Sequence, residues 1–328
     1  MTRLRRAIAL AGVTCALLAT ATVAHAAPAA AQPGNRQPGA CTDVAFLGAR
    51  GSGEAPGLGT TVQDAADRYQ KTVGSAVTVE TRPVAYPAVP ILDLDVVKQL
   101  QQAVADAGLW RWRPGLADQR PPVPGLSRTS TEWLLSSRMK YDNSVVEGTK
   151  NIRAQMSSAA SRCPNTRFVL AGYSQGAQVV TRFLESIDAG NPAGRALSER
   201  IIGIALFGSP MFAQYDPPVR VNRSRQGTAP YSFLRQGVYQ TLNDLPIGQS
   251  SVLSQPPWVT KTHSYCLGRD VVCQASSPLY RLFQFLGVDE GPSSIEPHLQ
   301  YRDYYTQDAA NWLAALTDQA RSTEPSRR

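Results

Sequence analysis

Short apolar runs alternate with stretches of helical periodicity along most of the chain. The apolar runs predict strands over residues 42–47, 77–84, 168–171 and 201–207, with a further strand and loop over 262–270. The helical periodicity predicts helices over 61–73, 144–160, 176–187 and 303–317. Strands that alternate with helices favour βαβ units, so we expect an α/β fold with a mainly parallel central sheet flanked by helices.

Two long stretches interrupt this alternation. Residues 89–140 include an amphipathic helical segment, 93–107, followed by Trp110, Trp112 and a proline-rich turn. Residues 211–261 are polar and rich in proline, with weak periodicity. Loops of this length are uncommon inside compact domains and are often functional, so we interpret both stretches as insertions. The first is expected to be either a cover over a site or a surface decoration that packs elsewhere.

The N-terminal segment has the three parts of a secretory signal peptide. An apolar, alanine-rich stretch over residues 7–23 follows three arginines and precedes the small-x-small sequence Ala24-His25-Ala26. We therefore expect residues 1–26 to be removed on export. An uncleaved membrane anchor is the alternative.

The same patterns divide the rest of the chain. Residues 27–40 are rich in proline, alanine and glycine and predict a flexible leader. Residues 41–318 are expected to form one α/β domain, and residues 319–328 a polar tail. A signal peptide implies a secreted, extracellular protein, with association to the cell wall as an open alternative. We favour a monomer, although the sequence leaves the oligomeric state open.

Charge and hydropathy narrow the classes of partner. The full chain has 33 Lys and Arg against 25 Asp and Glu, and removal of three arginines with the signal peptide leaves 30 − 25, or a net charge of about +5. The cations are scattered rather than gathered in a stripe with aromatic residues, which argues against nucleic-acid binding. No later stretch of 18 or more apolar residues occurs, so no transmembrane segment is predicted in the mature chain.

The cysteine count indicates disulfides. Of five cysteines, Cys15 lies in the signal segment, and the four that remain are Cys41, Cys163, Cys266 and Cys273. An even number in an exported protein suggests two disulfides, and the count alone leaves all three pairings open. A metal site is not expected, because the mature chain has no C-x-x-C motif and only two histidines.

Residues 172–176 form a G-x-S-x-G motif around Ser174. The motif follows the apolar run 167–171 and precedes a helical segment. A sharp strand-to-helix turn of this kind exposes the serine at the end of a sheet, close to the amide N–H groups of a helix N-terminus. The sequence therefore predicts that Ser174 is a nucleophile. An ordinary tight turn with a solvent-facing serine is the alternative.

A serine nucleophile needs a base, and the mature chain offers only His263 and His298. The usual chain order for this strand–turn–helix arrangement is nucleophile, acid, histidine, which favours His298. The candidate acid is Asp270, because a disulfide across the short loop around it would hold its carboxylate against the imidazole. His263 stays as an alternative base, as does the plain interpretation of a surface histidine and a turn aspartate.

A glycine-rich loop after the first predicted strand contains Ser52. The spacing from Cys41 to Ser52 is 11 residues, and the spacing from Cys163 to the motif serine is also 11. If the two cysteines pair, two parallel strands start level and both serines reach the carboxyl edge of the sheet, where open α/β sheets bind ligands. Ser52 would then donate to an oxyanion together with the backbone N–H of Gln175. The loop lacks the features of a nucleotide-binding motif.

Taken together, these segments resemble the cutinase family. The resemblance is carried by Phe46-Leu47-Gly48-Ala49-Arg50-Gly51-Ser52-Gly53-Glu54, Tyr86-Pro87-Ala88, Cys163-Pro164, Gly172-Tyr173-Ser174-Gln175-Gly176, the loop from Cys266 through Asp270 to Cys273, and His298. It covers most of residues 41–318. It implies an α/β-hydrolase fold with a central parallel sheet of five strands, here with two long insertions.

The resemblance also implies the roles of individual residues. Ser174, Asp270 and His298 correspond to a catalytic triad, and Ser52 and Gln175 to an oxyanion hole. The implied disulfide pairings are Cys41–Cys163 and Cys266–Cys273.

The predicted function is that of a secreted serine esterase. It would hydrolyse carboxylic esters, with lipid-like or polyester substrates, through an acyl-enzyme and without a cofactor. A carbohydrate-acetyl esterase or an acyltransferase on the same fold is the alternative among enzymes. From a different class, the alternative is a secreted binding protein without catalytic activity.

Overall fold

The computed structural model describes residues 41–90, 128–187, 191–213, 219–220, 237–238, 251–268, 270–274 and 295–323, with the backbone alone described at 128–138 and 219–220. By its internal contacts the chain divides into residues 1–40 and 41–328, and every described residue belongs to the second unit. The predicted signal peptide and leader lie outside the described residues, as do the helix predicted at 93–107 and the two tryptophans that follow it.

The described chain alternates strands and helices, as the pattern of the sequence predicts. The strands are β1 (Val44–Ala49), β2 (Val79–Pro83), β3 (Arg167–Tyr173), β4 (Ile201–Phe207), β5 (Val219–Arg220) and β6 (Thr262–Tyr265). The helices are α1 (Thr60–Val73), α3 (Arg128–Arg162), α4 (Gln175–Glu185), α5 (Pro192–Arg200) and α8 (Tyr304–Ser322), with short 3-10 helices at Gly74–Ala76, Val252–Ser254 and Pro297–Leu299. None of the helices in these ranges is long and apolar enough to cross a membrane.

The strands form one parallel sheet in the order β2-β1-β3-β4-β6-β5. Five of them make the central sheet that was expected, and the two-residue β5 adds a sixth strand at one edge. Every residue of β1 and β4 is buried, on both faces of the sheet. Such continuous apolar strands are typical of a parallel sheet that is covered by helices on both sides.

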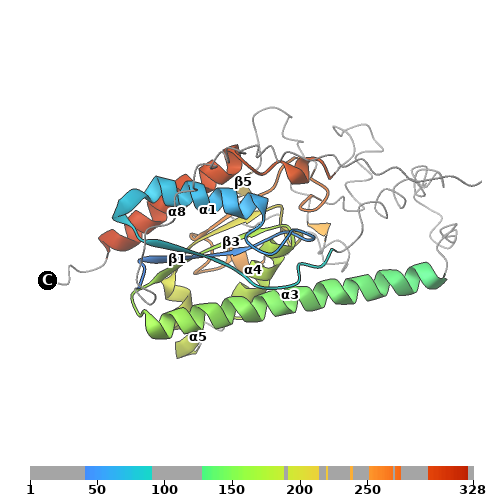
Figure 1. Ribbon diagram of the computed structural model, residues 1–328, viewed down its shortest axis with the longest axis horizontal. Coiled ribbons are helices and arrows are strands. Elements are labelled where there is room, and N and C mark those ends of the chain that lie inside the picture. Colours follow the sequence, from blue (N-terminus) through green and yellow to red (C-terminus); the bar gives the residue numbers. More distant parts are fainter. Residues whose placement is uncertain are drawn as a thin grey trace, which may run out of the picture. The chain divides into compact units, whose positions relative to one another are not determined.

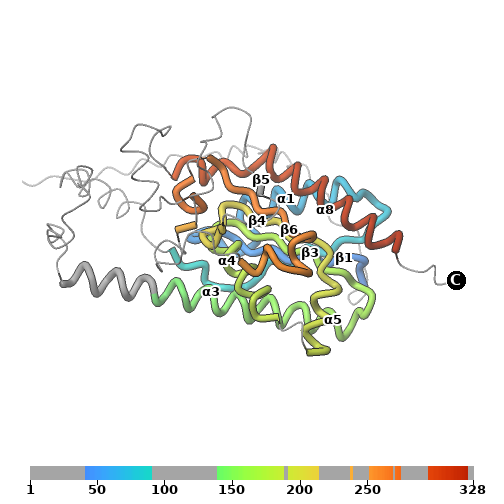
Figure 2. Tube along the Cα trace, turned by 180° about the vertical axis from the view of Figure 1, so that it is seen from behind, coloured from blue at the N-terminus to red at the C-terminus, as the bar shows by residue number. Residues whose placement is uncertain are grey.

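Helices cover both faces of this sheet, as Figures 1 and 2 show. On one face α4 packs directly on β1 and β3, and α3 packs against α4. The apolar core on this side includes Leu170, Val180 and Phe183. On the other face α1 and α8 pack against each other and against the sheet, around a second core that includes Phe46, Tyr69 and Phe207.

Three elements differ from the prediction. Helix α3 begins at Arg128 rather than at residue 144, so the last part of the first predicted insertion belongs to a helix that continues into the core. Helix α5 was not predicted, although Asn191 caps it by accepting a hydrogen bond from Gly194 N at 2.8 Å. Helix α8 runs on to Ser322, into the segment predicted as a polar tail.

The second predicted insertion also contributes to the core. Within residues 211–261, the described part includes β5 and the 3-10 helix at Val252–Ser254. Leu253 and Trp258 are almost fully buried in the core on the α4 side of the sheet. These two residues therefore belong to the framework of the domain.

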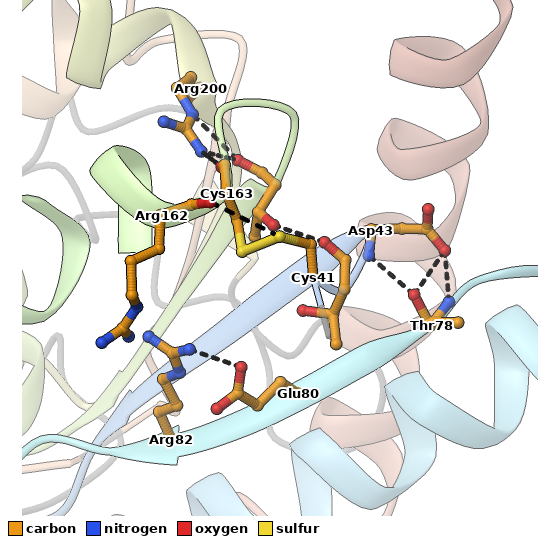
Figure 3. The surroundings of a disulfide bond; sticks show 10 residues. Cys41, Asp43, Thr78, Glu80, Arg82, Arg162, Cys163 and Arg200 are labelled. Carbon is orange, nitrogen blue, oxygen red and sulfur yellow. Dashed lines mark hydrogen bonds and ion pairs between the residues drawn. A yellow bond between two sulfur atoms is a disulfide. The ribbon is translucent and has the colours of Figure 1, made fainter. Parts of the chain in front are cut away.

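A disulfide ties the amino ends of two neighbouring strands. Cys41, just before β1, is bonded to Cys163, just before β3 (Figure 3). Arg200 holds the same turn, because its Nη2 donates to the carbonyl oxygen of Cys163 at 2.7 Å. On the other side of β1, Asp43 accepts a hydrogen bond from Thr78 N at 2.7 Å. The first strands are thus fixed relative to one another at this edge of the sheet.

The register of β1 and β3 shows how the two strands end at the carboxyl edge of the sheet. Val44 pairs with Arg167 and Ala49 with Gly172, without a shift between them. Ser52 follows Ala49 by three residues, and Ser174 follows Gly172 by two. Both serines therefore lie just past the carboxyl ends of adjacent parallel strands, as we expected. They are not level, because the register pairs residues 167 − 44 = 123 apart, whereas the two cysteines are 122 apart, so Ser52 lies one residue further along than Ser174.

Candidate active site

Ser174 occupies the single residue between β3 and α4. Its backbone has φ 55° and ψ −120°, a conformation that L-residues rarely adopt and that stores strain. The turn is held by a hydrogen bond from Ser174 N to the carbonyl oxygen of Phe207, at the end of the neighbouring strand. The side chain, half-buried, thus stands at the carboxyl edge of the sheet.

Two glycines make this turn possible, because each allows backbone segments to approach closely. A Cβ atom added at Gly172 would lie 2.5 Å from the carbonyl oxygen of Gly176. A Cβ atom added at Gly176 would lie 2.0 Å from the carbonyl oxygen of Ala49. The G-x-S-x-G spacing therefore permits the contact between β3 and α4 as well as that between α4 and the end of β1.

Ser174 also precedes the first turn of α4. Gln175 and Gly176 begin this helix, and the amide N–H groups at a helix N-terminus carry a partial positive charge. Negative charge that develops on an oxygen beside Ser174 would be stabilised there.

The loop that carries Ser52 is held by a buried arginine. Arg50 is 4% exposed, its Nη2 donates to the carbonyl oxygen of Tyr86 at 2.6 Å, and its Nε donates to that of Glu54 at 2.9 Å. The guanidinium lies over the ring of Tyr86, whose hydroxyl donates to the carbonyl oxygen of Arg50. These contacts fix the loop on both sides of Ser52.

Glu54 completes the loop and joins it to α1. Its carboxylate accepts hydrogen bonds from Gly51 N at 2.6 Å and from Thr60 N at 2.7 Å. The second of these bonds satisfies a free N–H group at the start of α1, where a negative charge is favourable. Ser52 therefore sits in a loop with little freedom to rearrange.

Asp270 and His298 are brought together from distant parts of the sequence. His298 Nδ1 lies 2.9 Å from Asp270 Oδ2, and both side chains are buried, at 4% and 0% exposure. The other carboxylate oxygen, Oδ1, accepts a hydrogen bond from Val272 N at 2.7 Å. Because the carboxylate faces Nδ1, that nitrogen carries the donated proton and Nε2 is left as the acceptor.

Aromatic residues enclose His298. The ring of Tyr173 stacks on the imidazole with 5.0 Å between centroids, and the Tyr173 hydroxyl donates to the His298 carbonyl oxygen at 2.9 Å. Burial and the nearby charges of Asp270 and Glu54 raise the pKa of Tyr173. The imidazole also lies against Gly208, where an added Cβ would be 2.6 Å from the ring. His298 thus packs between Tyr173, which precedes Ser174, and Gly208, which follows Phe207.

His298 Nε2 is buried and has no hydrogen-bond partner among the described residues. The structure therefore brings Asp270 and His298 into contact and sets Tyr173, the neighbour of Ser174, against the imidazole. It contains no hydrogen bond between Ser174 and His298.

The alternative base, His263, lies in β6 and is engaged elsewhere. Its ring stacks on Trp312 of α8 at 3.6 Å between centroids, and its Nδ1 lies 3.2 Å from the Tyr265 hydroxyl. That hydroxyl donates in turn to Asp308. His263 is therefore a core histidine that packs sheet against helix.

Both disulfides that the resemblance implies are present, namely Cys41–Cys163 and Cys266–Cys273. The second closes the short loop that carries Asp270. Within the described ranges, no group of three or more His, Cys, Asp or Glu side chains could hold a metal ion.

Sequence reasoning missed the residues that support the site. Arg50 and Glu54 lie in the same glycine-rich segment as Ser52, so two opposite charges beside a candidate site loop could have indicated that they hold it. Tyr301, which contacts both Asp270 and His298, gives no comparable signal in the sequence.

The parallel sheet, the strained serine at the β3–α4 turn and the carboxylate–histidine pair define an α/β-hydrolase fold. Within this class the chain belongs to the cutinase family, whose family profile, Cutinase, matches residues 134–317.

Curated relatives match part of the chain. It is 27% identical to the probable carboxylesterase Culp3 of Mycobacterium tuberculosis over 174 residues, which are 52% of this chain and 47% of that protein. It is 38% identical to a cutinase of Hypocrea jecorina over 64 residues, 20% of this chain and 23% of that protein. The chain thus spans about half, or less, of the length of these relatives.

A solved structure shows the same fold over nearly the whole chain. An acetylxylan esterase matches with a TM-score of 0.52, covering 85% of this chain and all of that one, at 18% sequence identity. At this identity the match concerns the fold alone.

Proposed function

We propose that this protein is a serine esterase in which Ser174 is the nucleophile, His298 the general base and Asp270 the residue that orients the base. The observation that carries the proposal is the state of His298. Its Nδ1 is held by a buried carboxylate while its Nε2 is buried without a described partner, beside the strained serine turn. A histidine that only stabilised the fold would be expected to have both nitrogens paired.

In the proposed reaction the Ser174 hydroxyl oxygen attacks the ester carbonyl carbon. His298 Nε2 takes the hydroxyl proton and then gives it to the leaving alkoxide, so an acyl-enzyme and an alcohol are formed. Water attacks the acyl-enzyme by the same route and releases the carboxylic acid. Asp270 keeps the Nδ1 proton in place and stabilises the imidazolium that forms in each step.

The oxyanion would be held by the Ser52 side chain and the backbone N–H of Gln175. Support comes from the strand register, by which Ser52 and Ser174 follow adjacent strands at the same edge of the sheet, one residue apart in level, and from the contacts that fix the Ser52 loop. Donors that are already in position need no rearrangement as charge develops, and the loss of one such donor typically costs about 10²–10³ in kcat.

We further propose that the substrates are carboxylic esters of lipid-like or polyester character. The matched relatives are named a carboxylesterase and a cutinase, which supports this class. The two disulfides fit an exported protein that acts in an oxidising environment.

A fluorophosphonate probe tests this function, because it reacts with an activated serine. We expect the full chain to be labelled at Ser174, and Ser174→Ala to abolish labelling and to lower esterase activity on a soluble short-chain ester by about 10⁴ or more. His298→Ala should lower esterase activity by a similar factor.

His263→Phe is the matched control, since a phenyl ring can keep the stack on Trp312. This variant should retain activity. An inactive His263→Phe beside an active His298→Ala, both folded by circular dichroism, would show that the base has been assigned wrongly.

A further inference from the structure

Tyr301 lies at the point where the carboxylate and the histidine meet. Its hydroxyl donates to Asp270 Oδ2 at 2.5 Å, the same oxygen that His298 Nδ1 approaches. The hydroxyl also accepts a hydrogen bond from Leu267 N at 2.9 Å, in the disulfide-closed loop. Its ring meets the imidazole edge-on, with 6.0 Å between centroids and an 83° angle between the planes.

The surroundings of Tyr301 keep this hydroxyl protonated. The side chain is fully buried. Burial, with the negative charge of Asp270 beside it, raises the pKa of Tyr301 well above its usual value. The neutral hydroxyl therefore remains available as a donor to Asp270 Oδ2.

We propose that Tyr301 is a positioning residue that acts on catalysis through Asp270. With Val272 N on Oδ1 and two donors on Oδ2, the carboxylate can adopt one orientation only, with Oδ2 aimed at His298. Tyr301 also takes up part of the negative charge on Oδ2, which limits how strongly the carboxylate holds the imidazolium. The inference rests on the proposed function of the site.

The expected consequences are specific to this role. Tyr301 is fully buried, and its hydroxyl bonds to Asp270 and Leu267 N, so its loss should lower kcat and leave KM nearly unchanged. Within the described part of the chain, the titratable groups that face His298 are Asp270, Tyr173 and Tyr301. Without the Tyr301 hydroxyl the carboxylate keeps more of its negative charge and favours the protonated imidazole. The acid limb of the kcat–pH profile should then move to higher pH.

The experiment compares Tyr301→Phe with Tyr305→Phe in the full chain. Tyr305 packs against Tyr301, at 6.0 Å between ring centroids, and its hydroxyl has no hydrogen bond to a described residue. For Tyr301→Phe we expect kcat to fall about tenfold and the acid limb to rise by about 0.5–1 pH unit, since a hydrogen bond to a charged group is lost. For Tyr305→Phe, kcat and the position of the acid limb should stay at the wild-type values.

A double-mutant cycle shows whether Tyr301 acts through the carboxylate. In an Asp270→Asn background, adding Tyr301→Phe should change kcat by less than about twofold, because the coupled partner is already gone. An additive loss of about tenfold would overturn the proposal. So would equal losses for Tyr301→Phe and Tyr305→Phe, which would indicate packing alone.

If Tyr301→Phe does not fold, 3-fluorotyrosine at position 301 keeps both shape and hydrogen bond. This phenol is a stronger donor, so the acid limb should move to lower pH, and an unmoved limb would refute the role. Fluorophosphonate labelling separates the two levels of inference. A wild-type chain that is not labelled refutes both, whereas a labelled wild type with an unchanged Tyr301→Phe refutes only the positioning role.

Discussion

Gly176→Ala should damage both the stability and the activity of the protein, because position 176 has no room for a side chain. A Cβ atom there would lie 2.0 Å from the carbonyl oxygen of Ala49 and 2.4 Å from its carbonyl carbon. Real Cβ atoms essentially never approach within 3.0 Å, so α4 and the end of β1 would have to separate by at least 3.0 − 2.0 = 1.0 Å. The obstacle is backbone, which cannot rotate away as a side chain can.

The size of this displacement indicates how much stability and activity the variant should lose. Overpacking a well-packed core typically costs about 1–3 kcal/mol, and a clash with backbone belongs at the upper end. A loss of about 3 kcal/mol corresponds to a fall in Tm of roughly 5–10 °C for a domain of this size. The same 1 Å shift moves Ser174 and Gln175 N relative to Ser52, and a misplacement of that size costs about 10²-fold in rate.

The assay is thermal unfolding together with esterase kinetics on a soluble ester. Gly268→Ala is the control, because a Cβ at Gly268 would meet nothing within 4 Å and the residue has no left-handed backbone. That variant should match the wild type in Tm. If Gly176→Ala unfolds within about 1 °C of the wild type and keeps its kcat, the close packing of α4 on β1 does not constrain the serine turn.

The remaining predictions concern covalent and titratable groups. Replacing Cys41 and Cys163 by serine opens a loop of 122 residues and should lower the free energy of unfolding by about 5 kcal/mol. Replacing Cys266 and Cys273 opens a loop of 7 residues and should lower it by about 2.5 kcal/mol. The second change should reduce esterase activity more, because that loop carries Asp270. Denaturant titrations of both double variants would contradict this if the costs were reversed. Burial raises the pKa of Tyr69 to about 12, so its neutral form is favoured in the folded state, and stability should fall as the pH rises from about 10 to 12. Tyr69→Phe should flatten that alkaline decline by roughly 3 kcal/mol, and an unchanged slope would show that Tyr69 does not ionise on unfolding.

Local patterns in the sequence account for most of the framework. Strand β4 was predicted with its observed ends, since a seven-residue apolar run can be buried on both faces only in a covered sheet. The serine turn was predictable because glycine spacing, strand and helix all lie within one short segment. Helix α5 could have been found as well, because Asn191-Pro192 is a recognisable N-terminal signal.

Features that depend on distant contacts could not be predicted in this way. The early start of α3 was missed because its first turns show no single apolar face. Tyr301 lies 31 residues from Asp270, and nothing local indicates that its hydroxyl points at that carboxylate. The choice between His263 and His298 as the base also depends on distant contacts, because Trp312 stacks on His263 whereas Asp270 bonds to His298.

The disulfide before β1 and β3 has a consequence for how this chain can diverge. Both serines lie 11 residues beyond the disulfide, so a single residue gained or lost between Cys41 and Ser52 would shift Ser52 along the edge of the sheet relative to Ser174. The two long intervening segments follow β2 and β4, outside those two spacings, and each doubling of a flexible loop's length adds only about 0.6 kcal/mol to the cost of closing it. A change in the length of these segments therefore leaves both serines at the same distance from the disulfide, provided that Leu253 and Trp258 keep their places in the core.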